Sequence, residues 1–138
     1  KSRKNLGPEV TRRMIIGGFV PSAGHAGKYF LKALKVKSKL TKQINDAFTK
    51  FDFLMSPTVP ILPFKLGEKI NDPVALFLVD VNTVTANLTG KPAISIPFSI
   101  SNGLPIGIQL MANSMQDKAL LQAARALEST VKLPEVQI

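Results

Sequence analysis

The chain contains no cysteine and a single histidine, His25. Without cysteine it can form no disulfide and can offer no thiol as a nucleophile or metal ligand. One histidine with scattered carboxylates does not make the His/Cys cluster that is typical of a zinc site. We therefore expect no disulfide framework, no metal centre and no cofactor held by these residues. The lack of cysteine also fits a cytoplasmic protein, which is the location we expect.

Long apolar runs are also absent. No stretch approaches the roughly 20 apolar residues that a transmembrane helix needs. The first residues, KSRKNLGPE, lack the apolar region of a signal peptide. At 138 residues the chain has the length of one domain and can bury a core. It starts at Lys1 instead of methionine, which we interpret as the start of a fragment.

The net charge of +9 is spread unevenly along the chain. Residues 1–50 hold twelve lysines and arginines against Glu9 and Asp46, whereas residues 51–138 hold six against seven acids. Such asymmetry can mark a surface for nucleic acid, and it can equally be a solvated helix face. The solvated face is the interpretation we favour, because no known RNA-binding motif accompanies the lysines.

A first helix is predicted over residues 8–17. Pro8 suits the first position of a helix, and Glu9 is favourable near the positive end of the helix dipole. The pair Gly17-Gly18 is expected to end this helix.

Three further helical segments follow from apolar spacing. Residues 26–49 place apolar side chains three or four apart and leave the lysines outside. Residues 73–89 are ambiguous between helix and strand, and short helices are preferred because the run is long and follows Asp72. A last helix is expected with Ser114 as its cap. Its apolar stripe comprises Leu120, Ala124, Leu127 and Val131.

Strands are predicted on both sides of a proline-rich loop. Residues 51–56 read as a short buried strand, and three prolines within residues 57–63 make the next segment an extended loop. Residues 94–101 and 106–110 alternate apolar and other side chains around Asn102-Gly103, a strong hairpin signal. Pro97 has no N–H to donate, so it is expected at an edge or a bulge. The pattern predicts an α/β protein with a mixed β-sheet covered by helices.

Several linked segments resemble a known family. They are LGEKINDP (66–73), Asp80, TANLTGKPAISIP (85–97), NGLPIGIQLM (102–111) and, upstream, PEVTRRMIIGGFVPSAG (8–24). Together they resemble the C-terminal part of the amidase signature family. The resemblance implies that residues 1–138 are a partial amidase-signature domain. It also implies that the Ser–Ser–Lys triad, which cleaves the amide, belongs to a glycine- and serine-rich segment that this sequence does not contain.

Within the family the resemblance is to the amidase component of the amidotransferase that acts on glutamyl-tRNA(Gln) or aspartyl-tRNA(Asn). It implies hydrolysis of glutamine to glutamate and ammonia. The ammonia would pass to a partner subunit, which would use ATP and Mg to convert Glu-tRNA(Gln) or Asp-tRNA(Asn) to its amidated form. The implied partners are the two other subunits of a heterotrimer, glutamine, and tRNA held mainly by those subunits. We expect no catalytic residue in this segment and no activity from it alone.

The resemblance assigns Arg13 and Asp80 to the glutamine pocket. Glutamine carries a carboxylate and an ammonium group on its α-carbon, so a selective pocket must supply a cation and an anion. Arginine offers a planar fork for a carboxylate, and aspartate can pair with the ammonium group. Without the resemblance, Arg13 reads as a surface helix residue and Asp80 as a helix cap or the partner of a lysine.

Other polar residues receive smaller roles. His25 lies three residues after Ser22, but spacing alone does not make a catalytic triad, and we expect a loop or helix-start residue. Arg12 is expected to face solvent if Arg13 faces the pocket. Gln109 is expected to be a buried hydrogen-bonding residue.

Two other functions stay open. One is an amidase-signature hydrolase that acts on a simple amide without any tRNA. The other is a basic RNA-binding module without catalysis, which would use the lysine-rich helix.

Overall fold

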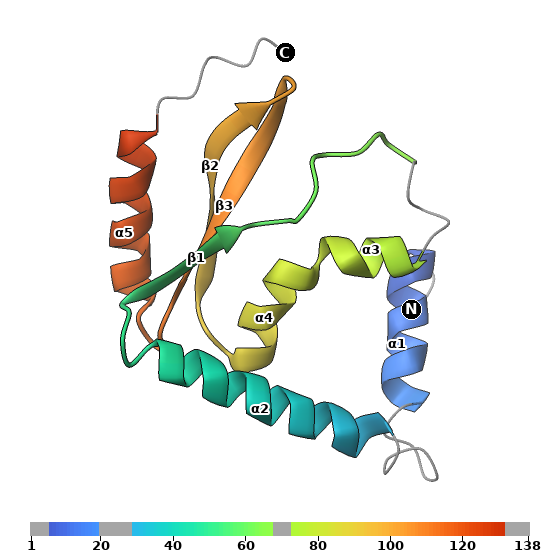
Figure 1. Cartoon of the computed structure of the whole chain (residues 1–138). Coiled ribbons are helices and arrows are strands. Elements are labelled where there is room, and N and C mark those ends of the chain that lie inside the picture. Colours follow the sequence, from blue (N-terminus) through green and yellow to red (C-terminus); the bar gives the residue numbers. More distant parts are fainter. Residues whose placement is uncertain (1–5, 20–28, 68–72, 132–138) are drawn as a thin grey trace. The chain divides into compact units, whose positions relative to one another are not determined.

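The computed structural model describes residues 6–19, 29–67 and 73–131 (Figure 1). The chain divides into two compact units, Lys1–Leu40 and Thr41–Ile138, and each is described by itself. His25 and Ser22 lie outside the described residues. Within those residues no helix is both long and apolar enough to cross a membrane.

The first unit contains helix α1 (Pro8–Phe19) and the first part of helix α2 (Leu31–Ala47). The predicted end of α1 at Gly17-Gly18 is wrong, because the helix continues to Phe19. Glycine lowers helix propensity by about 1 kcal/mol but keeps its backbone N–H, so it weakens a helix without breaking it. Helix α2 has no buried residue, and its N-terminal apolar side chains, such as Val36, are exposed.

A three-stranded sheet is the centre of the second unit. Its strands are β1 (Phe53–Pro57), β2 (Ala93–Ser101) and β3 (Leu104–Ala112), in the spatial order β1-β3-β2 with antiparallel pairing throughout. The α/β class predicted from the sequence is confirmed. The strands of the described residues form an antiparallel part of the sheet, with β3 between the other two.

The β2–β3 hairpin has the predicted turn. Asn102 and Gly103 both have positive φ, 53° and 76°, which suits the right-handed twist of the paired strands. The register shifts between Pro97 and Ser99, so Pro97 lies beside a bulge on an edge strand, as predicted.

One face of the sheet carries the apolar core. Helix α5 (Asp117–Thr130) runs beside the hairpin (Figure 1) and packs on β2 and β3. The buried residues there are Ile96, Leu110, Ala112, Leu120 and Ala124. Leu120 and Ala124 confirm the predicted helical stripe.

The predicted cap of this last helix is wrong. Helix α5 starts at Asp117 after Gln116, whose side chain makes no capping hydrogen bond. Ser114 lies earlier, where its backbone N–H donates to Asn113 Oδ1 (2.8 Å) and its hydroxyl accepts a bond from Lys91 Nζ (3.0 Å). The local side-chain bond of Asn113 therefore competes with a helix start at Ser114.

Two short helices follow the proline-rich loop, as predicted. They are α3 (Pro73–Val79) and α4 (Val81–Thr89), and Asp80 lies between them. Gly90 ends α4 with a left-handed backbone (φ 66°). Strand residues alternate between faces, so Leu54, Gln109 and Met111 share the face opposite α5. With Asn82 and Thr85 of α4 they line one cavity, which places α4 over that face.

Candidate substrate-binding site

Arg13 lies on α1 in a cluster of three charged side chains. The Arg13 Nε donates a hydrogen bond to Glu9 Oε1 at 2.8 Å, one helical turn earlier. Arg12 binds the same carboxylate through two atoms, with Nε on Oε2 and Nη2 on Oε1, each at 2.9 Å. Both arginines thus contact Glu9, and which of them faces the pocket stays a prediction.

The two arginines change the pKa of the Glu9 carboxyl. Hydrogen bonds from Arg12 and then Arg13 lower the pKa of Glu9 from 4.5 to about 2, because they stabilise its ionised form. The bond to Glu9 in turn raises the pKa of Arg12. Glu9 is therefore ionised over the neutral range.

Asp80 lies at the N-terminal cap position of α4 and is partly buried. Its side chain makes no capping hydrogen bond to the helix, so the alternative role of Asp80 as a side-chain helix cap is not observed. Its backbone is held on both sides: its N–H donates to Phe77 O (3.2 Å), and its carbonyl accepts from Val84 N and Thr83 Oγ1 (both 3.0 Å). The Cα of Asp80 is therefore fixed within the α3–α4 junction.

The two residues assigned to the glutamine pocket belong to different units. Arg13 is part of the first unit and Asp80 part of the second. Their pairing around one ligand stays a prediction.

A polar row crosses the sheet on the face opposite α5. Gln109 of β3 is paired with Ser56 of β1 and Ser95 of β2. Gln109 is buried and donates from Nε2 to Asn82 O at 3.3 Å, which confirms the buried hydrogen-bonding residue predicted there. Ser95 bonds the hydroxyl of Thr58 at 2.5 Å.

Asn82, which accepts the hydrogen bond from Gln109, was not identified from the sequence. Its Nδ2 donates to Pro57 O at 3.0 Å, which connects the first turn of α4 to the end of β1. The only sequence feature that could have indicated this role is an amide side chain two residues after Asp80, near the start of a helix. Its partner is 25 residues away, so no local pattern could identify the bond.

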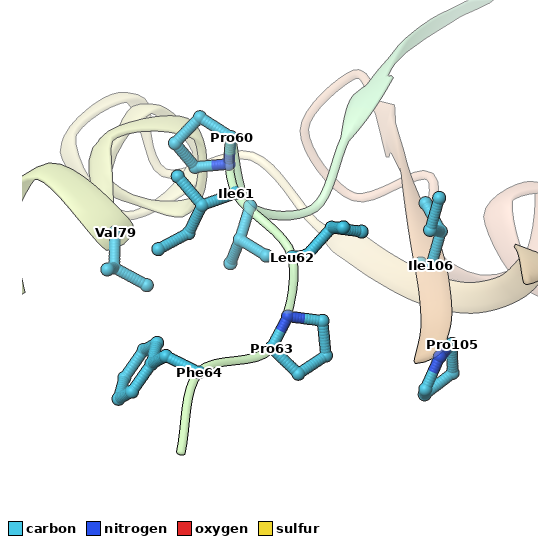
Figure 2. Close-up of a pocket in the computed structure, with 10 residues that line it drawn as sticks. Pro60, Ile61, Leu62, Pro63, Phe64, Val79, Pro105 and Ile106 are labelled. Atoms are coloured by element: carbon cyan, nitrogen blue, oxygen red, sulfur yellow. The ribbon is translucent and has the colours of Figure 1, made fainter. Parts of the chain in front are cut away.

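An apolar cavity of about 270 Å³ lies beside the α3–α4 junction. Figure 2 shows Val79 of α3 on one side, Pro105 and Ile106 of β3 on the other, and the proline-rich segment between them. Val79 directly precedes Asp80. These walls can surround the carbon chain of a ligand, but Asp80 is not among the residues that line the cavity.

The described part of the chain holds no cluster of metal-ligating side chains. Residues 6–19, 29–67 and 73–131 contain no group of three or more histidines, cysteines or carboxylates able to hold an ion.

Comparison with known proteins decides the family. The family model described as Amidase matches residues 1–121, which is most of the chain. The chain belongs to the amidase family.

Among members of this family, the chain is similar to several glutamyl-tRNA(Gln) amidotransferase A subunits. It is 58% identical over 135 residues to that of Cenarchaeum symbiosum (strain A), covering 98% of this chain and 28% of the relative. It is 46% identical to that of Methanococcoides burtonii, covering 91% of this chain and 26% of the relative. The chain thus spans little more than a quarter of these relatives, and matches their C-terminal part.

Solved amidase-family structures share the fold. The A subunit of the Thermotoga maritima glutamyl-tRNA(Gln) amidotransferase is similar with a TM-score of 0.74 and 40% identity, over 97% of this chain and 32% of that chain. This agreement supports the α/β arrangement of strands and helices described above.

Proposed function

We propose that this chain is part of the glutamine-hydrolysing A subunit of a tRNA-dependent amidotransferase. The observation that carries the proposal is the 58% identity, over nearly the whole chain, to a glutamyl-tRNA(Gln) amidotransferase A subunit. The whole protein would hydrolyse glutamine to glutamate and ammonia. A partner subunit would use the ammonia with ATP and Mg to convert Glu-tRNA(Gln) or Asp-tRNA(Asn) to the amidated form.

In this proposal the chain supplies one wall of the glutamine pocket and none of the catalytic triad. Arg13 binds the α-carboxylate, which its guanidinium can hold through two parallel hydrogen bonds. Asp80 binds the α-ammonium group from a backbone position held on both sides. These contacts orient the side-chain amide for a nucleophile elsewhere in the protein.

The test is ammonia release from glutamine by the full-length protein with its partner subunits. Arg13→Ala removes the charge-assisted bonds to the carboxylate, each worth about 1.5–3 kcal/mol, so KM for glutamine should rise roughly tenfold to a hundredfold. Arg125→Ala is the matched control, because Arg125 is an exposed arginine on α5. Equal kinetics for the two variants would refute the role of Arg13, and no ammonia from the unaltered protein would refute the function.

A hydrolase for a simple amide is the second candidate. The chain is also similar to a 6-aminohexanoate cyclic dimer hydrolase, with 29% identity and a TM-score of 0.65 over 80% of this chain. A simple-amide hydrolase would not need a cation and an anion for an amino acid. Charge reversal of both Arg13 and Asp80 should then leave its rate unchanged, whereas it should abolish glutamine use by an amidotransferase.

An RNA-binding role would instead use the exposed lysines of α2, which are Lys32, Lys35, Lys37, Lys39 and Lys42. It predicts RNA binding by the whole protein that falls steeply with salt. Binding that is absent or insensitive to salt would exclude this role.

A further inference from the structure

The α3–α4 junction, where Asp80 lies, is tied to the sheet by two amide side chains. Gln109 Nε2 donates to the backbone carbonyl of Asn82 at 3.3 Å. Asn82 Nδ2 donates to the backbone carbonyl of Pro57 at 3.0 Å. The first turn of α4 is thereby bonded to the central strand β3 and to the neighbouring strand β1.

Gln109 holds these bonds from a buried position on the central strand. It lies in the middle of β3, which is paired on both sides, and only 6% of its surface is exposed. A buried amide that loses its partner leaves its donor unsatisfied, which is unfavourable. The hydrogen bond to Asn82 O gives the Gln109 side-chain amide a partner. A shift of the first turn of α4 away from the sheet would break this bond.

Asp80 is connected to Asn82 through the first turn of α4. The Asp80 carbonyl accepts hydrogen bonds from Val84 N and Thr83 Oγ1, both at 3.0 Å. Asp80 and the first turn of α4 are therefore one hydrogen-bonded piece, and a shift of this turn against the sheet would displace the Asp80 carboxylate.

Apolar packing alone does not hold this piece in place. A cavity of about 200 Å³ lies between α4 and the sheet, lined in part by Asn82, Thr85, Gln109 and Met111. Side chains that border a void lack contacts on that side and lose part of their dispersion attraction. Directional hydrogen bonds therefore add to the packing that places this turn.

We propose that Asn82 and Gln109 are positioning residues that hold Asp80 where it receives the α-ammonium group of the substrate. This inference rests on the proposed function. It adds that the hydrogen bonds of Asn82 and Gln109, which do not touch the substrate, contribute to selectivity for an amino acid. A substrate without an α-amino group makes no ion pair with Asp80. Its kinetics should therefore not change when the hydrogen bonds of Asn82 or Gln109 are removed.

The test compares glutamine with glutaramate, which is glutamine without its α-amino group, in the full-length protein with its partner subunits. Asn82→Ala removes one neutral hydrogen bond, so KM for glutamine should rise about fivefold while kcat changes by less than about twofold. Kinetics with glutaramate should be unchanged. In an Asp80→Asn background, Asn82→Ala should raise KM for glutamine no further, because both act through one carboxylate.

Asn87→Ala is the matched control, because Asn87 lies on the same helix and its Nδ2 donates to Thr83 O within that helix (3.1 Å). It should leave both substrates unaffected. If Asn82→Ala does not fold, Asn82→Leu keeps the side-chain volume, and Gln109→Leu tests the second bond with the same expected pattern.

Three results would overturn the inference. An unchanged KM for glutamine in Asn82→Ala, alongside a raised KM in Asp80→Asn, would show that the network does not position Asp80. An equal loss with glutamine and glutaramate would show a general structural effect. An unaltered KM in Asp80→Asn would remove Asp80 from the site. Absence of ammonia release from the unaltered protein would refute the proposed function itself.

Discussion

Truncation of Leu120 tests how α5 is held against the sheet. Leu120 is 4% exposed and packs in the cluster that contains Ile96, Leu110, Ala112 and Ala124. Leu120→Ala would leave a void between the helix and the strands. The helix backbone would remain, because alanine is a stronger helix former than leucine.

The expected loss of stability follows from the neighbours of Leu120. Buried leucine-to-alanine changes cost about 2–5 kcal/mol, depending on how far the site can collapse. Two of the neighbours, Ala112 and Ala124, are too short to extend into the void, and Ala112 is fully buried on the central strand. We therefore expect a loss of about 3–4 kcal/mol, in the middle of this range.

Leu121→Ala is the matched control, because Leu121 is the next residue of α5 and is 60% exposed. It makes the same chemical change with the same effect on helix propensity, and should cost less than about 0.5 kcal/mol. Urea unfolding of the full-length protein measures the difference, and amide hydrogen exchange of α5 shows whether the helix opens locally. Equal losses in the two variants would refute the arrangement of this core.

Three further predictions concern α1, the hairpin and the start of β2. The Glu9 carboxyl should titrate with a pKa of about 2, because Arg12 and Arg13 donate hydrogen bonds to it, and carbon NMR titration can measure this pKa. The stabilisation of α1 by these bonds is fully present above pH 4.5 and is lost as the pH falls through about 2. Gly103→Ala should cost about 1–2 kcal/mol in urea unfolding, because its φ of 76° is unfavourable for residues with a Cβ. Lys91→Met should cost only about 1 kcal/mol in the same assay, because Lys91 is only partly buried and loses its hydrogen bonds to the loop before α5 and its position over the Phe48 ring.

Each of these predictions has its own contrary result. A Glu9 titration near 4.5 would show that the arginines do not bind its carboxylate, and replacing both arginines with alanine should bring it there. A Gly103→Ala variant with the same free energy of unfolding as the unaltered protein would contradict the positive φ of Gly103. A loss of several kcal/mol in Lys91→Met would mean that Lys91 is more deeply involved in packing than its partly buried position indicates.

The sequence was sufficient for the elements whose signals are local. The Asn102-Gly103 turn, the bulge beside Pro97 and the stripe of Leu120 and Ala124 all depend on residues close together in the chain. Backbone preferences and apolar periodicity act over a few residues, so they can be read without the fold. The same holds for the family, because its motifs are contiguous segments.

Local signals failed where competing bonds decided the outcome. Ser114 matched the pattern of a helix cap, but Asn113 and Lys91 bond it in the loop before α5. The glycine pair in α1 matched a helix stop, but glycine retains the backbone bonds that continue a helix.

Only the tertiary structure decided how Asp80 is held. The sequence by itself determined that an aspartate follows an apolar run and that Gln109 faces a buried environment. It could not show that Gln109 bonds Asn82 across 27 residues, or that Asn82 bonds Pro57 across 25. Such bonds form only when antiparallel pairing brings β1 and β3 together beneath α4, because hydrogen bonds between distant residues depend on distances that the folded chain alone creates.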